Sequence, residues 1–236
     1  MVERKFVTLD RLFIGRAIPY GPNGELSAIH KAPLEGPVTV TSLGLTGDQQ
    51  GDPRHHGGPD KAIHHYPADH YPHWQQQLPD THGKRWHCGA FGENISTVGL
   101  TESDVCFGDI FALGSVRLQV SQARQPCWKL NHRFHEKDMA QRVQDSGRTG
   151  WYYRVLTPGT LQAGDRFKLI DRPHPDWPLT RILHFLFLDP LNTEALRAMH
   201  ELPRLPASWQ KLLEHRLNTG EVESWDRRLR TPTKTV

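Results

Sequence analysis

A proline-rich stretch near residue 175 divides the chain into two parts with different hydrophobic periods. Pro173, Pro175 and Pro178 fall within six positions and predict a stiff linker. Before it, short apolar runs alternate with glycine, proline and aspartate, whereas beyond it apolar residues recur with the period of an α-helix. Because this period decides which element can bury those residues, the chain is expected to combine a β part with a helical part.

The first part, residues 1–172, has the pattern of a mainly β domain that resembles a barrel. Residues 116–121 alternate apolar and polar side chains, as a half-buried strand does. Strands are expected at residues 13–16, 38–40, 94–96, 109–112, 116–121, 152–156 and 166–170. The 18 prolines and 20 glycines fit the many turns between such strands. Two helices, near residues 68–78 and 136–145, interrupt them, and Gly147 is the expected C-cap of the second.

The second part, residues 173–236, predicts a small α-helical domain of three short helices. The first contains Leu179, Ile182, Leu183, Leu186 and Phe187 at helical spacing. Asn192 or Thr193 can cap a second helix that reaches Met199. A third contains Trp209, Leu213 and Leu217 and ends at Gly220.

Charge and cysteine usage exclude several classes of protein. The 29 Lys and Arg against 26 Asp and Glu leave a net charge of only +3, which does not predict a nucleic-acid-binding protein. The three cysteines lack CxxC spacing and fit a reducing compartment. No apolar run approaches the roughly 20 residues that span a bilayer. The N-terminal segment also lacks the long apolar core of a secretory signal peptide. We therefore expect a cytoplasmic protein without a membrane segment.

The segment 121–131, SQARQPCWKLN, contains the most informative cysteine. Cys127 follows an expected strand and a proline, so it should lie at the rim of the sheet. Arg124 and Lys129 can lower the pKa of its thiol and favour the thiolate, which acts as a nucleophile or a metal ligand. The alternative is a buried structural cysteine. Cys88 and Cys106 have fewer basic neighbours and are interpreted as structural.

The segment 55–66, HHGGPDKAIHHY, contains four of the 15 histidines. Its Gly57-Gly58 turn allows close approach of a ligand to the backbone, and the histidines and lysine around it could attract a phosphate. Strand alternation places His64 and His65 on opposite faces, so only one of them can serve one site. A zinc site that uses two of these histidines, and a solvated loop without a function, are the alternatives.

A third segment, 91–95 or FGENI, places Asn94 at the start of a strand. Its amide can satisfy backbone groups in a turn, or it can bind the edge of a heterocycle, because it offers both a donor and an acceptor.

These segments, in this order, resemble the MOSC family, the domain named for the C-terminal part of molybdenum cofactor sulfurases, and most closely its stand-alone YiiM-type branch. The matching pieces are residues 27–31 (SAIHK), 44–48 (GLTGD), 56–60 (HGGPD), 91–94 (FGEN), 108–109 (GD) and 121–131. They cover most of residues 13–170, and the helical tail resembles the three-helix domain of that branch.

The resemblance implies a β-barrel-like MOSC fold that binds the molybdenum cofactor, molybdopterin. Cys127 matches the cysteine that ligates molybdenum and is the implied catalytic residue. Lys31, His56 and Arg124 match positions suited to the phosphate and pterin edge of the cofactor. Asn94 and Ser121 would bind the pterin, with His65 or Asp48 in support. His55 could replace His56 in this set, and His64 could replace His65.

The implied reaction is a detoxifying, pyridoxal-phosphate-independent reduction of N-hydroxylated compounds, such as 6-hydroxylaminopurine-type base analogues, to amines. No flavin, haem or iron–sulfur motif is visible, so a separate electron donor of the flavoprotein type is the expected partner. Neither nucleic acid nor membrane is an expected partner, and the sequence is compatible with a homodimer.

Two other functions remain open. Cys127 could carry a persulfide in a sulfur carrier or sulfurtransferase, which needs a reactive thiol but no metal. Alternatively, the chain could be a non-enzymatic cofactor-binding module whose C-terminal helices dock a partner.

Overall fold

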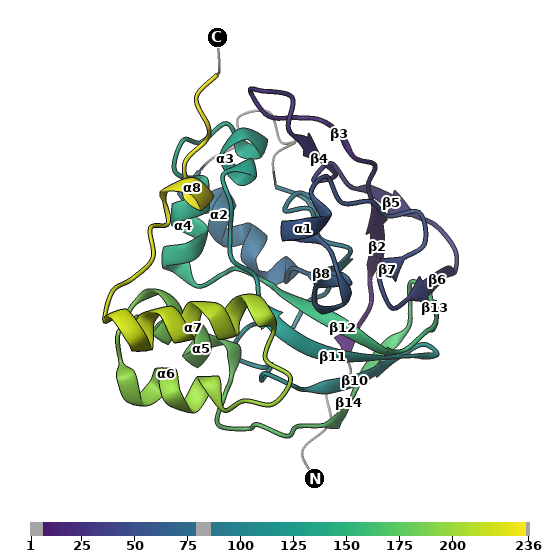
Figure 1. The fold of residues 1–236 in the computed structure, drawn as a ribbon. Coiled ribbons are helices and arrows are strands. Elements are labelled where there is room, and N and C mark those ends of the chain that lie inside the picture. The colour runs from purple at the N-terminus through teal and green to yellow at the C-terminus, as the bar shows by residue number, and fades with distance from the viewer. Residues whose placement is uncertain (1–6, 79–85, 235–236) are drawn as a thin grey trace.

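A curled sheet of mixed strand direction forms the centre of the molecule (Figure 1). The computed structural model describes residues 7–78 and 86–234, apart from the side chains of Arg54 and His55. In order across the sheet, the strands are β1 (Val7–Thr8), β14 (Arg166–Asp171), β10 (Ile110–Leu113), β11 (Val116–Ala123), β12 (Trp151–Thr157), β8 (Ile63–His65), β9 (Ile95–Ser96), β2 (Arg11–Ile14) and β5 (Ala32–Leu34). The β8–β9 pair is parallel, and the other pairs of this sheet are antiparallel.

Two smaller sheets lie beside this one. They consist of β13 (Gly159–Leu161), β6 (Val38–Thr41) and β7 (Gly44–Leu45), and of the pair β3 (Ile18–Pro19) and β4 (Leu26–Ser27). The helical elements between the strands are α1 (Pro53–His56), η1 (Pro59–Lys61), η2 (Ala68–His70), α2 (Tyr71–Gln77), α3 (Lys129–Phe134) and α4 (Met139–Ser146). The C-terminal helices are α5 (Leu179–Phe187), α6 (Thr193–His200), α7 (Ala207–Thr219) and α8 (Asp226–Leu229).

The predicted combination of a barrel-like β part and a helical C-terminal part is confirmed. The predicted caps are present as well. Asn192, rather than Thr193, caps α6, because its side chain accepts a hydrogen bond from the Ala195 amide. Gly147 and Gly220 end α4 and α7 with φ values of 67° and 66°, in the left-handed region that glycine adopts without strain.

The main difference from the predicted elements lies directly after Cys127. The chain turns at once into α3, a helix of 6 residues. A helix this short covers fewer than two turns, so its apolar residues show no clear period in the sequence. The expected helix at residues 136–145 begins at Met139 instead of residue 136.

The apolar core continues from the sheet into the C-terminal helices. Leu118 and Val120 of β11 belong to the same buried cluster as Leu179, Ile182 and Leu186 of α5. Among the described residues, no helix is both long enough and apolar enough to cross a membrane.

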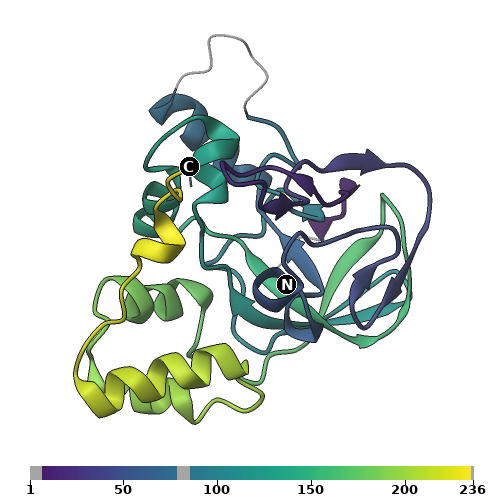
Figure 2. The same cartoon turned by 45° about the horizontal axis from the view of Figure 1, so that its top comes forward.

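After α7 the chain returns to the β part. The yellow segment that contains α8 leaves α7 and runs back to α3 and α4 in two views (Figures 1 and 2). The amide of Trp128 donates to the carbonyl of Arg228 at 2.7 Å, which places the tail against the loop that carries Cys127.

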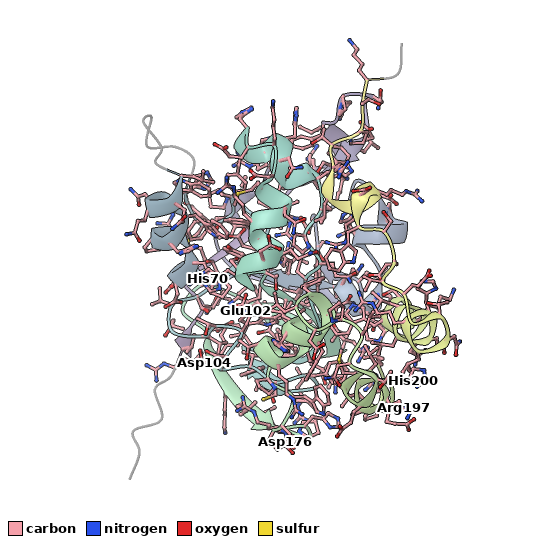
Figure 3. All side chains as sticks on the ribbon, turned by 90° about the vertical axis from the view of Figure 1, so that its left-hand side faces the viewer. His70, Glu102, Asp104, Asp176, Arg197 and His200 are labelled. Carbon is pink, nitrogen blue, oxygen red and sulfur yellow. The ribbon has the colours of Figure 1, made fainter. Side chains whose placement is uncertain are left out.

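A buried hydrogen-bonded pair, Glu102 and His70, fixes the loop that precedes β12. Glu102 binds Nε2 of His70 at 2.7 Å, and the two side chains lie next to each other in Figure 3. Its other carboxylate oxygen accepts the Gly150 amide, also at 2.7 Å. The carbonyl of Gly150 in turn accepts the amide of Arg124 at 2.9 Å. The pair therefore holds the backbone from which the Arg124 side chain extends.

Candidate functional site

Cys127 lies at the junction of β11 and α3, in the wall of a cleft that is open to solvent. The cleft draws its walls from segments far apart in the chain. Its polar lining includes Lys31, His56, Lys61, His64, Asn94 and Arg124. Tertiary folding thus gathers four of the predicted cofactor-binding residues around the cysteine.

The surroundings of Cys127 favour its thiolate. Burial alone would raise the pKa of the thiol, but the hydrogen bond and charge of His56, the charge of Arg124 and the amide of Lys129 outweigh it and lower the pKa to about 6. The distance from Sγ to Nε2 of His56 is 3.5 Å. At neutral pH the thiolate therefore predominates, which is the form that binds metals and attacks electrophiles.

Lys61 adds a further basic group to the cleft. Burial lowers the pKa of its ammonium, while the charges of Cys127 and Asp60 act in the opposite direction. Lys61 lies at the end of η1, and its Nζ is 6.0 Å from the centre of the Tyr152 ring. Thiolate and ammonium therefore stabilise each other across the cleft.

Three buried polar atoms of the cleft residues have no hydrogen-bond partner among the described residues. They are Nδ1 of His56, Nε2 of His64 and Nη1 of Arg124. His64 and Arg124 are only 5% and 7% exposed. An unpartnered buried polar group costs about 1–3 kcal/mol, and native proteins leave few of them. Three such atoms in one cleft are the pattern of a site that a polar ligand completes.

His64 and Arg124 offer this ligand opposite kinds of hydrogen bond. Burial, then the charge of Arg124, lowers the pKa of His64 well below its ordinary value, so its imidazole is neutral. A neutral ring has one nitrogen that accepts a hydrogen bond, whereas the guanidinium of Arg124 only donates. The pair suits a heterocycle edge, or an anion beside a ring N–H. The molybdenum cofactor has such a pterin edge and a phosphate, so the residues present fit this group.

Lys31, Asp48 and Asn94 line the cleft but are bonded to one another and to the backbone. Lys31 pairs with Oδ1 of Asp48, and Nδ2 of Asn94 donates to Oδ2 of the same carboxylate at 2.8 Å. Asn94 also donates to the carbonyl of Phe13 at 3.1 Å and accepts the amide of His64 at 3.0 Å. This network holds β2 and β8 together beneath the cleft.

The neighbouring residue Glu93 organises the loop of the FGENI segment. Its carboxylate accepts the amides of Gly89 and Phe91 at 2.5 and 3.0 Å, and the hydroxyl of Tyr71 at 2.5 Å. Burial raises the pKa of Glu93, and the hydrogen bonds from the Tyr71 hydroxyl and the Gly89 amide oppose that rise. Glu93, which is not among the predicted site residues, therefore satisfies the backbone amides of this loop.

Two of the predicted cofactor-binding residues lie elsewhere. The ring of His65 is fully buried, with Nδ1 3.1 Å from the hydroxyl of Tyr153 and Nε2 2.9 Å from that of Thr97. The hydroxyl of Ser121 lies 2.5 Å from the carbonyl of Asp60 and 3.1 Å from that of Tyr152, so its hydrogen bond is made within the protein. Neither residue belongs to the cleft lining. His65 shares the face of Ile63, which is part of the apolar core, and the Ser121 hydroxyl lies against the carbonyls of Asp60 and Tyr152.

His64 takes the place in the cleft that His65 was expected to occupy. The alternation of β8 contained the signal: Ile63 and His65 share one face, and Ile63 is buried in the apolar core. Of the pair His55 and His56, His56 lines the cleft, and the side chain of His55 lies outside the described residues.

The zinc alternative has no ligand set among the described residues. In the part of the chain that the structure describes, no three or more His, Cys, Asp or Glu side chains lie close enough together to hold a metal ion. Cys88 and Cys106 lie outside the cleft lining, and burial raises the pKa of each thiol. Cys127 is therefore the cysteine that the structure places in the cleft.

Comparison with known families gives two matches in order along the chain. The MOSC domain matches residues 52–168. The YiiM-like, 3-alpha helix domain matches residues 177–220. The first contains Cys127 and about half of the residues that line the cleft, and the second contains the helices that follow the proline-rich stretch.

Two named relatives and one solved structure are similar over much of the chain. Protein YiiM of Escherichia coli (strain K12) is 38% identical over 218 residues, which cover 92% of this chain and 96% of that protein. A protein named "Reductase" from Gibberella moniliformis is 37% identical over 182 residues, 76% of this chain but only 32% of that protein. The crystal structure of YiiM from Escherichia coli matches with a TM-score of 0.77 and 35% identity, covering 91% of this chain and 98% of that one.

Proposed function

The chain belongs to the MOSC domain family, and from that premise we propose that it is a molybdenum-cofactor-dependent oxidoreductase that reduces N-hydroxylated compounds to amines. The observation that carries the proposal is the cleft: a cysteine with a thiol pKa of about 6 lies beside three buried polar atoms that have no protein partner. A soft thiolate suits a transition metal, and the unpartnered atoms suit a polar, ring-containing ligand. The name of the fungal relative, "Reductase", agrees with this reaction class.

We assign the following roles to residues of this chain. Cys127 holds the metal, Arg124 binds the phosphate or pterin edge, and His64 accepts a hydrogen bond from a ring N–H. Lys31, Asp48 and Asn94 keep the floor of the cleft in place through their mutual hydrogen bonds. His65 and Ser121 stabilise the strands to which they belong. The cofactor, when bound, supplies the two-electron redox chemistry.

The reaction requires two protons as well as two electrons. One N-hydroxylated substrate takes up both and yields one amine and one water, because the N–O bond breaks and oxygen leaves as water. His56 is the proton source we propose, since its Nε2 lies 3.5 Å from the Cys127 sulfur and its Nδ1 has no partner in the described protein. The electrons come from a separate donor of the flavoprotein type.

Metal analysis of Cys127→Ser tests the proposal. Both the wild type and the variant are produced in cells that make the cofactor, and molybdenum is measured by plasma mass spectrometry. We expect molybdenum in the wild type and its loss in Cys127→Ser, together with the loss of hydroxylaminopurine reduction. Cys88→Ser is the matched control, because Cys88 lies outside the cleft lining, and it should retain both.

A sulfur carrier is the competing function, since a thiolate of low pKa also forms a persulfide. Wild-type protein without molybdenum, whose intact mass shows one additional sulfur on Cys127, would replace the first proposal with this one.

A further inference from the structure

A single residue of the C-terminal tail is bonded to the residues on both sides of Cys127. The Nη1 of Arg228 donates to the carbonyl of Pro126 at 2.7 Å. The carbonyl of Arg228 accepts the amide of Trp128, also at 2.7 Å. Cys127 lies between these two bonds, so Arg228 restrains the backbone on which the thiolate is mounted. Arg228 belongs to α8, about a hundred residues further along the chain.

The guanidinium of Arg228 is itself held from two other directions. Its Nη2 donates to Oε1 of Gln144 on α4 at 2.5 Å. Its Cζ lies 5.6 Å from the centre of the Phe187 ring at the end of α5. The planar fork of an arginine can donate in two fixed directions at once, which a lysine cannot reproduce. Arg228 thereby connects α4, α5 and the Cys127 loop.

Further contacts fix the tail on either side of Arg228. The Nδ2 of Asn131, on α3, donates to the carbonyl of Leu229 at 2.8 Å, and Oδ1 of Asn131 accepts the amide of Ala140 at 2.7 Å. On the other side, Glu223 binds the guanidinium of Arg216 at 2.7 and 2.8 Å. The tail is therefore anchored to α7 at one end and to α3 at the other, with Arg228 between the anchors.

We propose that Arg228 is a positioning residue of the site, which fixes the direction in which Cys127 presents its sulfur to the cleft. The observations that carry this inference are the two hydrogen bonds that flank Cys127 and the second anchor of the guanidinium on Gln144. Arg228 lies beyond the residues matched by the 3-alpha helix domain, which end at residue 220. The inference rests on the proposed role of Cys127 as the metal-binding thiolate, because only then does the direction of the sulfur matter for the reaction.

The decisive variant is Arg228→Met, which keeps an unbranched apolar side chain against Phe187 and removes the side-chain donors to Pro126 and Gln144. The backbone carbonyl that accepts the Trp128 amide remains. Its matched control is Arg227→Met, the same substitution at the adjacent, exposed residue of α8. For each variant, kcat per bound molybdenum and KM are measured on the loaded protein. Amide hydrogen exchange of residues 124–131, and the alkylation rate of Cys127 at a pH well above the pKa of its thiol, are measured on cofactor-free protein.

For Arg228→Met we expect kcat per molybdenum to fall about ten- to a hundredfold, because a small displacement of a reacting group costs this much. KM should stay close to that of Arg227→Met. The amides around Cys127 should exchange faster and its alkylation rate should change, whereas Arg227→Met should match the wild type. Arg228→Lys keeps the positive charge but not the planar, two-directional donor group of arginine. Its activity should therefore lie between those of Arg228→Met and the wild type.

Other results would overturn the inference. It is wrong if kcat per molybdenum equals that of Arg227→Met, even where amide exchange changes, because Arg228 would then contribute to stability alone. If Arg228→Met does not fold, Arg228→Lys decides, and wild-type exchange and kcat in that variant would refute the positioning role. If the wild type itself binds no molybdenum, the proposed function fails, but exchange and alkylation still show whether Arg228 holds the Cys127 loop.

Discussion

At the scale of single residues, the charge state of one cysteine follows from side chains that the fold brings to it. His56 is 71 residues before Cys127 in the chain, yet its Nε2 is 3.5 Å from the sulfur. The structure opposes ionisation by burial and favours it more strongly by the hydrogen bond and charge of His56 and by the charge of Arg124. The reactivity of Cys127 at neutral pH is therefore a property of its neighbours.

The pH dependence of Cys127 alkylation checks this account. Because the pKa of the thiol is lowered to about 6, the thiolate predominates above that pH and is lost below it. The rate with iodoacetamide on cofactor-free protein should rise through a midpoint near pH 6, instead of the usual value of about 8.5. His56→Gln removes the imidazole that lowers the pKa of the Cys127 thiol and should move the midpoint upward. The control is His87→Gln, the same substitution at an exposed histidine. An unchanged midpoint in His56→Gln would contradict the role of His56 in lowering the pKa of the thiol.

At the scale of elements, the Asn94 side chain adds hydrogen bonds between β2 and β8, the two strands that pair with β9 on either side. Its side chain bonds to the backbone of β2 and β8 and to the Asp48 carboxylate. The FGENI segment predicted an amide that either satisfies a turn or binds a heterocycle. In the structure, both the donor and the acceptor of the Asn94 amide form hydrogen bonds within the protein, and the residue still forms part of the cleft wall.

Asn94→Asp should destabilise the fold by about 2–3 kcal/mol at neutral pH, because it places a second carboxylate against Asp48 and removes a buried donor. The repulsion raises the pKa of the new carboxyl in the folded state. Its penalty is therefore present at neutral pH and declines as the pH falls through that raised pKa. Urea unfolding at several pH values measures this effect. Asn218→Asp, on the exposed end of α7, should cost less than about 1 kcal/mol, and an equal loss in both variants would count against the network.

At the scale of the whole molecule, the C-terminal helices are part of the same apolar core as the sheet. Leu179, Ile182 and Leu186 of α5 are fully buried together with Leu118 of β11. The tail beyond α7 then returns to the Cys127 loop. The domain boundary at residue 172 stays a prediction. The shared apolar core indicates that each of the two parts depends on the other for its stability.

Deletion of residues 176–236 should consequently leave a chain without a cooperative unfolding transition, because it exposes the apolar face of β11 that α5 covers. In the full-length protein, far-UV circular dichroism and tryptophan fluorescence should give coincident urea transitions, as one cooperative unit does. A fragment 1–175 with its own sharp transition would show instead that the β part folds independently. If the truncated chain does not fold, its loss of activity with a partner carries no information about docking by the helices.

The sequence by itself determined the fold class and the helix caps, and it predicted Cys127 as the reactive cysteine. These depend on local patterns: the period of apolar residues, turn chemistry, and the motifs shared with the MOSC family. It also contained enough to choose His64 over His65, because residues i and i+2 of a strand share a face and Ile63 is apolar.

Only the tertiary structure decided which distant side chains meet. The proximity of His56 to Cys127, the Lys31–Asp48–Asn94 network and the return of Arg228 to the loop at residues 126–128 join positions separated by up to about a hundred residues. No local pattern encodes such contacts, because they depend on strand order and on the path of the chain between elements. The unpartnered atoms of His64 and Arg124 belong to the same class, since burial is a property of the folded chain.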